Sequence, residues 1–373
     1  MRVTLGDVCE KGASNLKQSD VVNMTGKYPI YGAAGYIGNV DFYHQEKPYV
    51  AIVKDGAGIG RTALYPAKSS VIGTMQYLLP KDNVLPEYLC YVVRHMHLEK
   101  YFTGATIPHI YFRDYKNEKF NLDSLDKQAE IIEILGKAES IILKRRKELA
   151  ELDNLIKARF VEMFGDMYLN TMEWRELQLE TMADIVSGIT KGRKIAGKQL
   201  TKVPYMAVSN VKDGYIDWTT VKTIEATDQE INQYRLLPDD VLMTEGGDPD
   251  KLGRGAIIRT PLENCIHQNH IFRVRLDESH ILPDYFAEYL KHQRAKRYFL
   301  GCAKQTTGIA SINMKQLKAL PVLLPPLELQ NEFSAFIRQI DKSKVVESIH
   351  RMNVLFNITL NGGNRYDIRA NEF

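Results

Sequence analysis

A glycine-rich segment follows a short apolar run near residue 50. Residues 49–53 read as a buried strand, and Asp55-Gly56-Ala57-Gly58-Ile59-Gly60 comes soon after it. A glycine loop of this kind holds a phosphate or a cofactor carboxylate when it opens a helix, whose first N–H groups face the anion. Here residues 61–65 read as a second strand, and Pro66 prevents a helix. The segment therefore predicts a turn between strands, and a stand-alone enzyme that binds AdoMet or a nucleotide at Asp55–Gly60 stays an alternative hypothesis.

A comparable turn occurs in the second half of the chain. A strand-like run at 240–244 leads into Glu245-Gly246, and Gly253-Arg254 precedes the next strand. Both halves thus contain a strand, an acidic residue with glycine, a loop, a Gly-Arg pair and another strand. Because the frame is shared and the loop length differs, the pattern is typical of loops that recognise a ligand.

His267 and His270 have the spacing of half a metal site. No third ligand of matching type lies at motif spacing, and the alternation around them predicts strand residues. The sequence also contains no G-K-[ST] phosphate loop, no G-x-S-x-G elbow and no H-E-x-x-H helix. We therefore expect no metal site and no catalytic residues in this chain.

Two polar loops, 103–110 and 305–313, carry Thr, Ser, Gln, Asn and His. These side chains suit hydrogen bonds to base edges, although they also suit any surface loop. The basic run Lys144–Lys147 suits phosphate contacts and equally a solvated helix face. From loop position and chemistry, we expect DNA contacts at Lys54, Arg61, Thr106, His109, Arg113, Lys191, Arg193, Lys194, Asn210, Lys251, Arg254, Lys304, Gln305, Thr306, Thr307 and Ser311.

A long helix over Leu125–Phe164 must position these loops. Apolar residues recur there three or four apart without a proline, which is the period of a helix that buries one narrow seam. Forty residues would span about 60 Å, a length that requires a partner helix. Residues 327–344 supply that partner in the same chain, and Asn361-Gly362-Gly363-Asn364 is expected to end it. The expected packing residues are Ile132, Leu135, Ile142, Leu149, Leu152, Ile156, Phe160, Phe333, Phe336, Ile337 and Ile340.

The chain contains an internal repeat. Leu327-Glu328-Leu329-Gln330 repeats Leu125-Asp126-Lys127-Gln128, and the LPDY at 282–285 repeats the LPEY at 85–88. These motifs keep their order, together with a Tyr-Phe pair and a glycine between them. The pattern predicts a duplicated unit of one domain and one long helix. Within the domains, we expect helices over 86–101 and 283–301 and a strand over 215–220.

The composition indicates two ordinary globular domains. The chain has 373 residues, 44% of them hydrophobic and 25% charged, with a formal net charge of +3. That charge permits a local basic face without demonstrating nucleic-acid binding. Four cysteines occur singly and no run approaches the roughly 18 apolar residues of a membrane span, so we expect a cytoplasmic protein without a membrane partner.

The ordered duplication resembles the specificity (S) subunit of type I restriction-modification systems. The resemblance covers nearly the whole chain, and its carriers include Leu125-x-x-Gln128, Leu327-x-x-Gln330 with the preceding Pro325-Pro326, and residues 239–247 with Gly253-Arg254. Residues 157–165, which include Lys-Ala-Arg-Phe and Met-Phe-Gly, also match. The stretch after Lys344 departs from the charged pattern of the first helix.

The resemblance implies an α+β fold in which two similar target-recognition domains are joined by two antiparallel long helices. It implies a first domain over 1–121, a spacer helix over 122–165, a second domain over 166–325, and a second helix with a tail over 326–373. The implied function is non-catalytic reading of a bipartite site in double-stranded DNA. The implied partners are two modification methyltransferase subunits and the restriction motor-nuclease subunits of a bacterium or archaeon. AdoMet, ATP and Mg²⁺ are then expected only on those partners, and a coiled-coil adaptor that binds protein alone is a third hypothesis.

Overall fold

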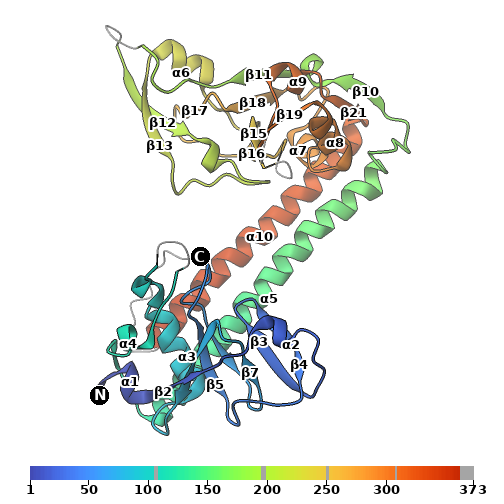
Figure 1. Ribbon diagram of the computed structural model, residues 1–373. Helices are drawn as coiled ribbons and strands as arrows, with labels where there is room; N and C mark the ends of the chain where they lie inside the picture. The colour runs from blue at the N-terminus through green and yellow to red at the C-terminus, as the bar shows by residue number, and fades with distance from the viewer. Residues whose placement is uncertain (105–107, 195–198, 249–251, 307–308, 362–373) are drawn as a thin grey trace. The chain divides into compact units, whose positions relative to one another are not determined.

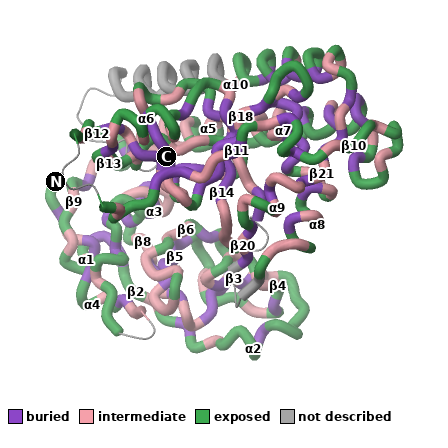
Figure 2. Tube along the Cα trace, turned by 90° about the horizontal axis from the view of Figure 1, so that it is seen from above, coloured by how far each residue is buried: buried purple, intermediate pink, exposed green. Residues whose placement is uncertain are grey.

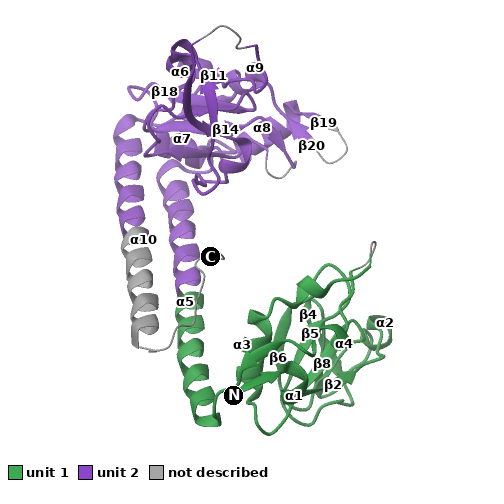
Figure 3. Ribbon diagram, turned by 90° about the vertical axis from the view of Figure 1, so that its left-hand side faces the viewer, with its two compact units in different colours: residues 1–144, 358–373 green, residues 145–357 purple. Residues whose placement is uncertain are grey.

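The computed structural model describes residues 1–104, 108–194, 199–248, 252–306 and 309–361, with side chains except at 305, 306, 309 and 345–361. The chain divides into two compact units, one that holds residues 1–144 and one that holds residues 145–357 (Figure 3). The division lies inside the long helix. We call residues 1–121 the first domain and residues 166–325 the second domain; these predicted boundaries stay a prediction.

Three small sheets form the first domain (Figure 1). A two-stranded sheet joins β1 (Arg2–Thr4) to β9 (Lys119–Asn121), so the two ends of the domain meet. The four-stranded sheet has the order β2 (Cys9–Ala13), β8 (Met75–Pro80), β5 (Tyr49–Val53) and β6 (Thr62–Tyr65). The three-stranded sheet has the order β4 (Gly35–Val40), β3 (Tyr28–Gly32) and β7 (Ser70–Val71), with β3 and β7 parallel.

The helices of the first domain are short. They are α1 (Leu5–Val8), α2 (Gln18–Val21), α3 (Pro86–His95), a 3₁₀ turn at Leu98–Tyr101 and α4 (Phe112–Tyr115), and the long helix α5 (Leu125–Phe164) follows the domain. Every residue of the central strand β5 is buried, because β8 and β6 flank it and α3 packs near it. Its Tyr-Val-Ala-Ile-Val sequence lacks the polar alternation of a half-exposed strand for that reason.

The second domain repeats this topology. Strand β10 (Arg175–Gln178) pairs with β21 (Pro321–Leu324), and the four-stranded sheet has the order β11 (Ala183–Ser187), β18 (Ile271–Leu276), β14 (Asp240–Thr244) and β16 (Gly255–Ile258). The three-stranded sheet has the order β13 (Lys222–Ala226), β12 (Thr201–Met206) and β17 (Ile266–His267), again with one parallel pair. Strand β14 and the first four residues of β18 are wholly buried (Figure 2).

A fourth sheet and further helices complete the second domain. That sheet has the order β15 (Gly246–Gly247), β20 (Ile309–Ser311) and β19 (Lys304–Thr306). The helices are 3₁₀ turns at Leu179–Thr181 and Val208–Asn210, then α6 (Asp228–Tyr234), α7 (Pro283–Tyr289), α8 (Gln293–Cys302), α9 (Met314–Lys318) and α10 (Leu327–Asn361).

Three local predictions were wrong. The helix expected over 86–101 ends at His95, and His97 has a positive φ of 50° that separates α3 from the 3₁₀ turn. The helix expected over 283–301 is two helices, because the backbone of His292 is extended between them. Residues 215–220 form only an isolated bridge, and the strand that pairs with β12 is β13 instead.

The long helix α5 has the predicted bounds and is unbroken. Gly165 follows it with a φ of 76° and donates its N–H to the carbonyl oxygen of Val161 at 2.9 Å, which closes the last turn. Within the second unit, α5 and α10 lie side by side (Figures 1 and 3). Arg159 contacts Glu332 and Asp153 contacts Lys344, so the helices run antiparallel. The predicted α+β fold with an internal repeat and two long helices is confirmed.

Candidate nucleic-acid interface

In the first domain, the glycine-rich turn after β5 lies against the polar loop that follows the 3₁₀ turn. Lys54 accepts a hydrogen bond through its carbonyl oxygen from Ile110 N–H at 2.9 Å, and Gly56 donates to the carbonyl oxygen of Pro108 at 2.9 Å. An isolated bridge also joins Asp55 to His109. The backbone thus brings two loops that are about fifty residues apart in sequence to one end of the sheet. We call residues 54–61, 103–104 and 108–113 the first tip.

The second domain has an equivalent arrangement after β14. The carbonyl oxygen of Glu245 accepts a hydrogen bond from Ile312 N–H at 2.9 Å, and Gly246 pairs with Ser311 in the register of β15 and β20. A Cβ at Gly246 would lie 2.9 Å from the carbonyl oxygen of Ala310, so the close approach requires glycine. We call residues 245–248, 252–254, 270, 304–306 and 309–312 the second tip.

Each tip carries a carboxylate bound to an imidazole. In the first, His109 Nδ1 lies 2.6 Å from Asp55 Oδ1, and in the second, His270 Nδ1 lies 2.6 Å from Glu245 Oε2. A carboxylate on Nδ1 fixes the ring orientation and the tautomer, which leaves Nε2 as the atom that can meet another group. All four side chains retain solvent exposure. Sequence reasoning named His109 as a DNA contact, placed Asp55 and Glu245 in the glycine turns, and considered His270 only as a metal ligand; it did not predict that each carboxylate binds a histidine.

The pair His267 and His270 does not form half of a metal site. His267 is fully buried, and its Nδ1 lies 3.0 Å from the carbonyl oxygen of Tyr234, while His270 is exposed and binds Glu245. Burial lowers the pKa of His267 to about 4, so its ring is neutral at physiological pH. Among the described residues, no three His, Cys, Asp or Glu side chains gather as metal ligands would.

Three alternate residues of the first tip, His109, Tyr111 and Arg113, contact one another in sequence order. The rings of His109 and Tyr111 stack at 6.3 Å between centroids with planes 21° apart, and the Arg113 guanidinium lies 4.9 Å from the centre of the Tyr111 ring. Tyr111 is 44% exposed, and the side chain of Arg113 is 78% exposed. An aromatic ring beside a guanidinium can stack on bases and contact phosphate. Tyr111 was missed, although its spacing of two from His109 and Arg113 was a visible signal.

Two other predicted contacts of the first domain, Lys54 and Arg61, lie on the same tip. Lys54 forms an ion pair with Asp55 at 3.8 Å, and Arg61 is exposed with its Nε 3.4 Å from the carbonyl oxygen of Gly58. Thr106 lies outside the described residues.

Two predicted contacts of the second domain belong to its framework. Asn210 is fully buried, donates to the carbonyl oxygen of Asp217 at 2.9 Å and accepts from Ala207 N–H, so it cannot reach a base. Arg193 holds Glu230 at 2.5 Å with both side chains under 20% exposed. The predicted DNA contact at Asn210 is therefore corrected, because a buried side chain whose polar atoms are all engaged has no atom left for a ligand. Arg193 is half-buried and also donates to the carbonyl oxygen of Glu225, and its contact with DNA stays a prediction.

The other predicted residues of the second domain have different positions. Lys191, Lys194 and Lys304 are exposed, and Ser311 is half-buried in β20. Lys251 and Thr307 lie outside the described residues, as do the side chains of Gln305 and Thr306.

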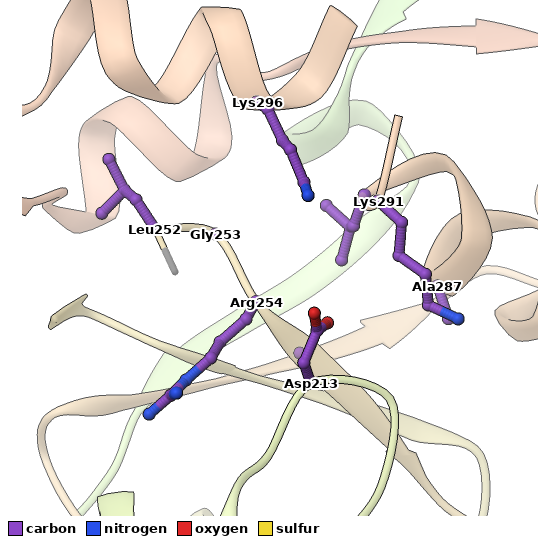
Figure 4. Close-up of a pocket in the computed structure, with 9 residues that line it drawn as sticks. Asp213, Leu252, Gly253, Arg254, Ala287, Lys291 and Lys296 are labelled. Carbon is purple, nitrogen blue, oxygen red and sulfur yellow. The ribbon is translucent and has the colours of Figure 1, made fainter. Parts of the chain in front are cut away.

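Arg254 lines a small cavity of about 10 Å³ beside the second tip (Figure 4). Lys291, Lys296 and Asp213 also line it, and in the close-up the chain turns at Gly253 next to Arg254. Gly253 has a φ of 74°, and a Cβ there would lie 2.3 Å from the Phe299 ring, so only glycine fits. The cavity accommodates no more than a water molecule.

The expected helix-packing residues divide between two cores. Ile132 packs against the core of the first domain, whereas Leu152, Ile156 and Phe160 belong to the core of the second unit with the four residues expected on α10. Those four are Phe333, Phe336, Ile337 and Ile340. Leu135, Ile142 and Leu149 are half-buried between these cores. None of the helices in the described ranges is long and apolar enough to cross a membrane.

Comparisons with known proteins identify a family. A family model described as the type I restriction modification DNA specificity domain matches residues 1–154 and 172–353. The protein of Methanocaldococcus jannaschii named for the MjaX type I restriction enzyme specificity subunit is 28% identical over 171 residues, which are 45% of this chain and 40% of the relative. The EcoKI specificity subunit of Escherichia coli is 24% identical over 202 residues, which are 53% and 42%. The chain thus matches less than half the length of each relative.

A solved structure shares the fold. The crystal structure of the S subunit of a type I restriction-modification system from M. genitalium superposes with a TM-score of 0.58 at 14% sequence identity. The superposition covers 96% of this chain and 94% of that one.

Proposed function

This chain belongs to the family of type I restriction modification DNA specificity domains, and we propose from that membership that it is the DNA sequence-specificity subunit of a type I restriction-modification complex. Each domain contacts one half of a bipartite site in double-stranded DNA. The long helices set the gap between the half-sites and dock two modification methyltransferase subunits. Restriction motor-nuclease subunits complete the complex.

The observation that carries this proposal is the duplicated unit. Two domains of the same topology each end in a long helix, and each presents a paired set of loops after its central strand. Two readers reach the same face of a duplex only when they are about 34 Å or a multiple apart. A helix of forty residues can set such a distance, whereas a flexible linker would accept many gap lengths.

The differences between the two tips indicate that the two half-sites differ in sequence. The first tip presents His109 and Tyr111 from a loop and Arg113 from α4, and its strand pairing is limited to isolated bridges of His109 with Asp55 and Thr103. The second tip has the longer pairing of the sheet β15, β20 and β19. Lys and Arg contacts to phosphates position a domain without reading sequence, whereas side chains at base edges specify it. Because the tips differ in backbone as well as in side chains, the two halves of the site should differ in sequence.

We place the catalytic chemistry on the partner subunits. The glycine-rich turn at Asp55–Gly60 leads into strand β6 and not into a helix, so its N–H groups are not arranged as in a phosphate loop. AdoMet would then bind the modification subunits, and ATP with Mg²⁺ the restriction subunits. The chain alone should bind no AdoMet in equilibrium dialysis, and saturable binding would support the alternative enzyme.

The decisive experiment is methylome sequencing of a host that expresses this chain with its modification subunit. The expected result is one methylated bipartite motif with a fixed gap and two unlike halves. A host that expresses the modification subunit alone is the control. Methylation without a bipartite motif, or no change from the control, would contradict the proposal.

A further inference from the structure

A buried glutamine stands at the start of each long helix. Gln128, in the first turn of α5, is fully buried, and its Oε1 accepts the N–H of Leu85 at 2.8 Å. Its Nε2 donates to the carbonyl oxygens of Asn83 at 3.0 Å and Asp123 at 2.9 Å. One side chain thus joins the turn before α3, the segment after β9 and the long helix.

The second repeat contains the same junction. Gln330, in the first turn of α10, is fully buried and accepts the N–H of Leu282 at 2.9 Å. Its Nε2 donates to the carbonyl oxygens of His280 at 3.2 Å and Pro325 at 2.9 Å. Leu85 and Leu282 are the residues that cap α3 and α7, so the bonds fall at equivalent places in both repeats.

An amide is the only side-chain group that can make this junction. It accepts one hydrogen bond and donates two, whereas a carboxylate only accepts and a thioether makes none of comparable strength. Each buried backbone group left without a partner costs about 1–3 kcal/mol. The junction is therefore stiff when glutamine is present, and it loosens when the amide is lost.

Further contacts hold the same helices to their domains. Tyr88 of α3 donates to Asp123 at 2.7 Å, and its counterpart Tyr285 of α7 donates to the carbonyl oxygen of Leu323 at 2.6 Å. In the first repeat, Glu139 of α5 accepts from Tyr91 at 3.0 Å. Glu139 lies eleven residues after Gln128, close to three helical turns, and so on the same face. The glutamine is thus the buried member of a larger set of contacts that hold the domain to its long helix.

We propose that Gln128 and Gln330 are positioning residues that lock each recognition domain onto its own long helix and so restrict the gap at which the two half-sites are accepted. This inference rests on the proposed function. It assigns the repeated Leu-x-x-Gln motif a role in spacing, apart from the loops that contact DNA. Loss of the amide frees the domain to tilt on its helix, and the tips then reach half-sites at neighbouring gaps.

The test uses the chain assembled with its modification subunits, and it compares methylation across DNA sites whose gap varies by one base pair. The variants are Gln128→Met and Gln330→Met, which keep the side-chain length and remove all three bonds. Tyr91→Phe removes only the exposed hydrogen bond from α3 to Glu139 of α5, which gives a milder variant if the Met variants fail to fold. Gln339→Met is the matched control, because Gln339 is exposed on α10.

Each junction variant is expected to keep the two half-site sequences and to lower the preference for the wild-type gap by about tenfold. The control should keep the wild-type preference. Folded variants whose preference is unchanged, or whose methylation falls equally at every gap, would overturn the inference. If the wild-type complex itself shows no bipartite motif, the proposed function fails instead, so the two failures are distinguishable.

Discussion

Phe160 of α5 and Phe333 of α10 meet edge to face, with ring centroids 5.3 Å apart and planes 73° apart. Both rings are fully buried, and Tyr285 of α7 stacks on Phe160 at 5.5 Å. The contact therefore joins both long helices to the core of the second domain. Aromatic pairs of this geometry contribute beyond the area that they bury.

Phe160→Ala should destabilise the second unit by about 3–5 kcal/mol, because it leaves a cavity among four other rings. The free energy of unfolding, measured by chemical denaturation, checks this. Leu155→Ala is the control, since Leu155 is on the same helix and 47% exposed; its effect should stay within about 0.5 kcal/mol. Equal losses for the two variants would show that the rings are not the anchor.

A buried histidine makes the second domain sensitive to mild acid. His267 is held neutral by burial, with its pKa lowered from the usual 6.5 to about 4. The unfolded chain takes up this proton below about pH 6.5 while the folded chain does not, so stability should fall as the pH falls from 6.5 to 4. The loss is on the order of 3 kcal/mol, since one pKa unit is about 1.4 kcal/mol.

His267→Gln should weaken this pH dependence and lower the stability at pH 7. Denaturation curves of the wild type and the variant between pH 4 and 7 measure the difference. His280→Gln is the control, because His280 is exposed. If the two variants give the same slope as the wild type, His267 is not the group that titrates.

The Arg193–Glu230 ion pair makes the stability of the second domain depend on pH in a more acidic range. The Arg193 guanidinium lowers the pKa of Glu230 from 4.5 to about 2, and the carboxylate also caps α6 through Thr227 N–H at 2.9 Å. The contribution of the charged Glu230 to the free energy of unfolding is fully present above about pH 4.5 and is lost as the pH falls toward 2. Glu230→Gln keeps the cap and removes the charge, so it should cost about 1–2 kcal/mol at pH 7.

The difference in stability between wild type and Glu230→Gln should therefore shrink between pH 4.5 and pH 2. Glu263→Gln, at an exposed position, should give a small difference that does not change with pH. A Glu230 difference that stays constant over this range would refute the assignment.

The length of α5 could be predicted from sequence because local signals agree over the whole element. The apolar period runs without proline, and Gly165 supplies the positive φ that ends the helix. The break between α7 and α8 could not be predicted from sequence, because no proline or glycine occurs at His292 to indicate it. That imidazole stacks on Phe160 at 4.4 Å, a contact made by a residue 132 positions earlier. Tertiary packing decides this boundary.

The tips were harder to predict than the helices. Residue type and loop position suggested Asn210 and Arg193, but neither reveals whether a polar side chain is already engaged inside the domain. The pairs Asp55–His109 and Glu245–His270 were missed because each joins residues that are 54 or 25 positions apart. Only the pairing of strands and loops brings them together.

Arg113 should act on DNA through charge. Its side chain is largely exposed beside Tyr111, so Arg113→Gln should weaken binding of the assembled complex about equally on specific and unrelated DNA and lower the slope of log affinity against log salt by about one. Titrations at several salt concentrations measure the slope. Lys137→Gln, an exposed change on α5, should leave it unchanged. Loss of specific binding alone would assign Arg113 to base reading instead.

His109 should act on sequence. Asp55 orients its ring, so His109→Ala should relax one base position in one half of the methylated motif, at a cost of about 1–3 kcal/mol in discrimination, and leave the other half unchanged. Asp55→Asn should relax the same position less, because it keeps a weaker partner for Nδ1. His97→Ala is the control, since His97 is an exposed histidine of the same domain whose Nδ1 lies 3.2 Å from Glu99. A motif that stays unchanged in His109→Ala, or that changes in both halves, would remove His109 from the reading surface.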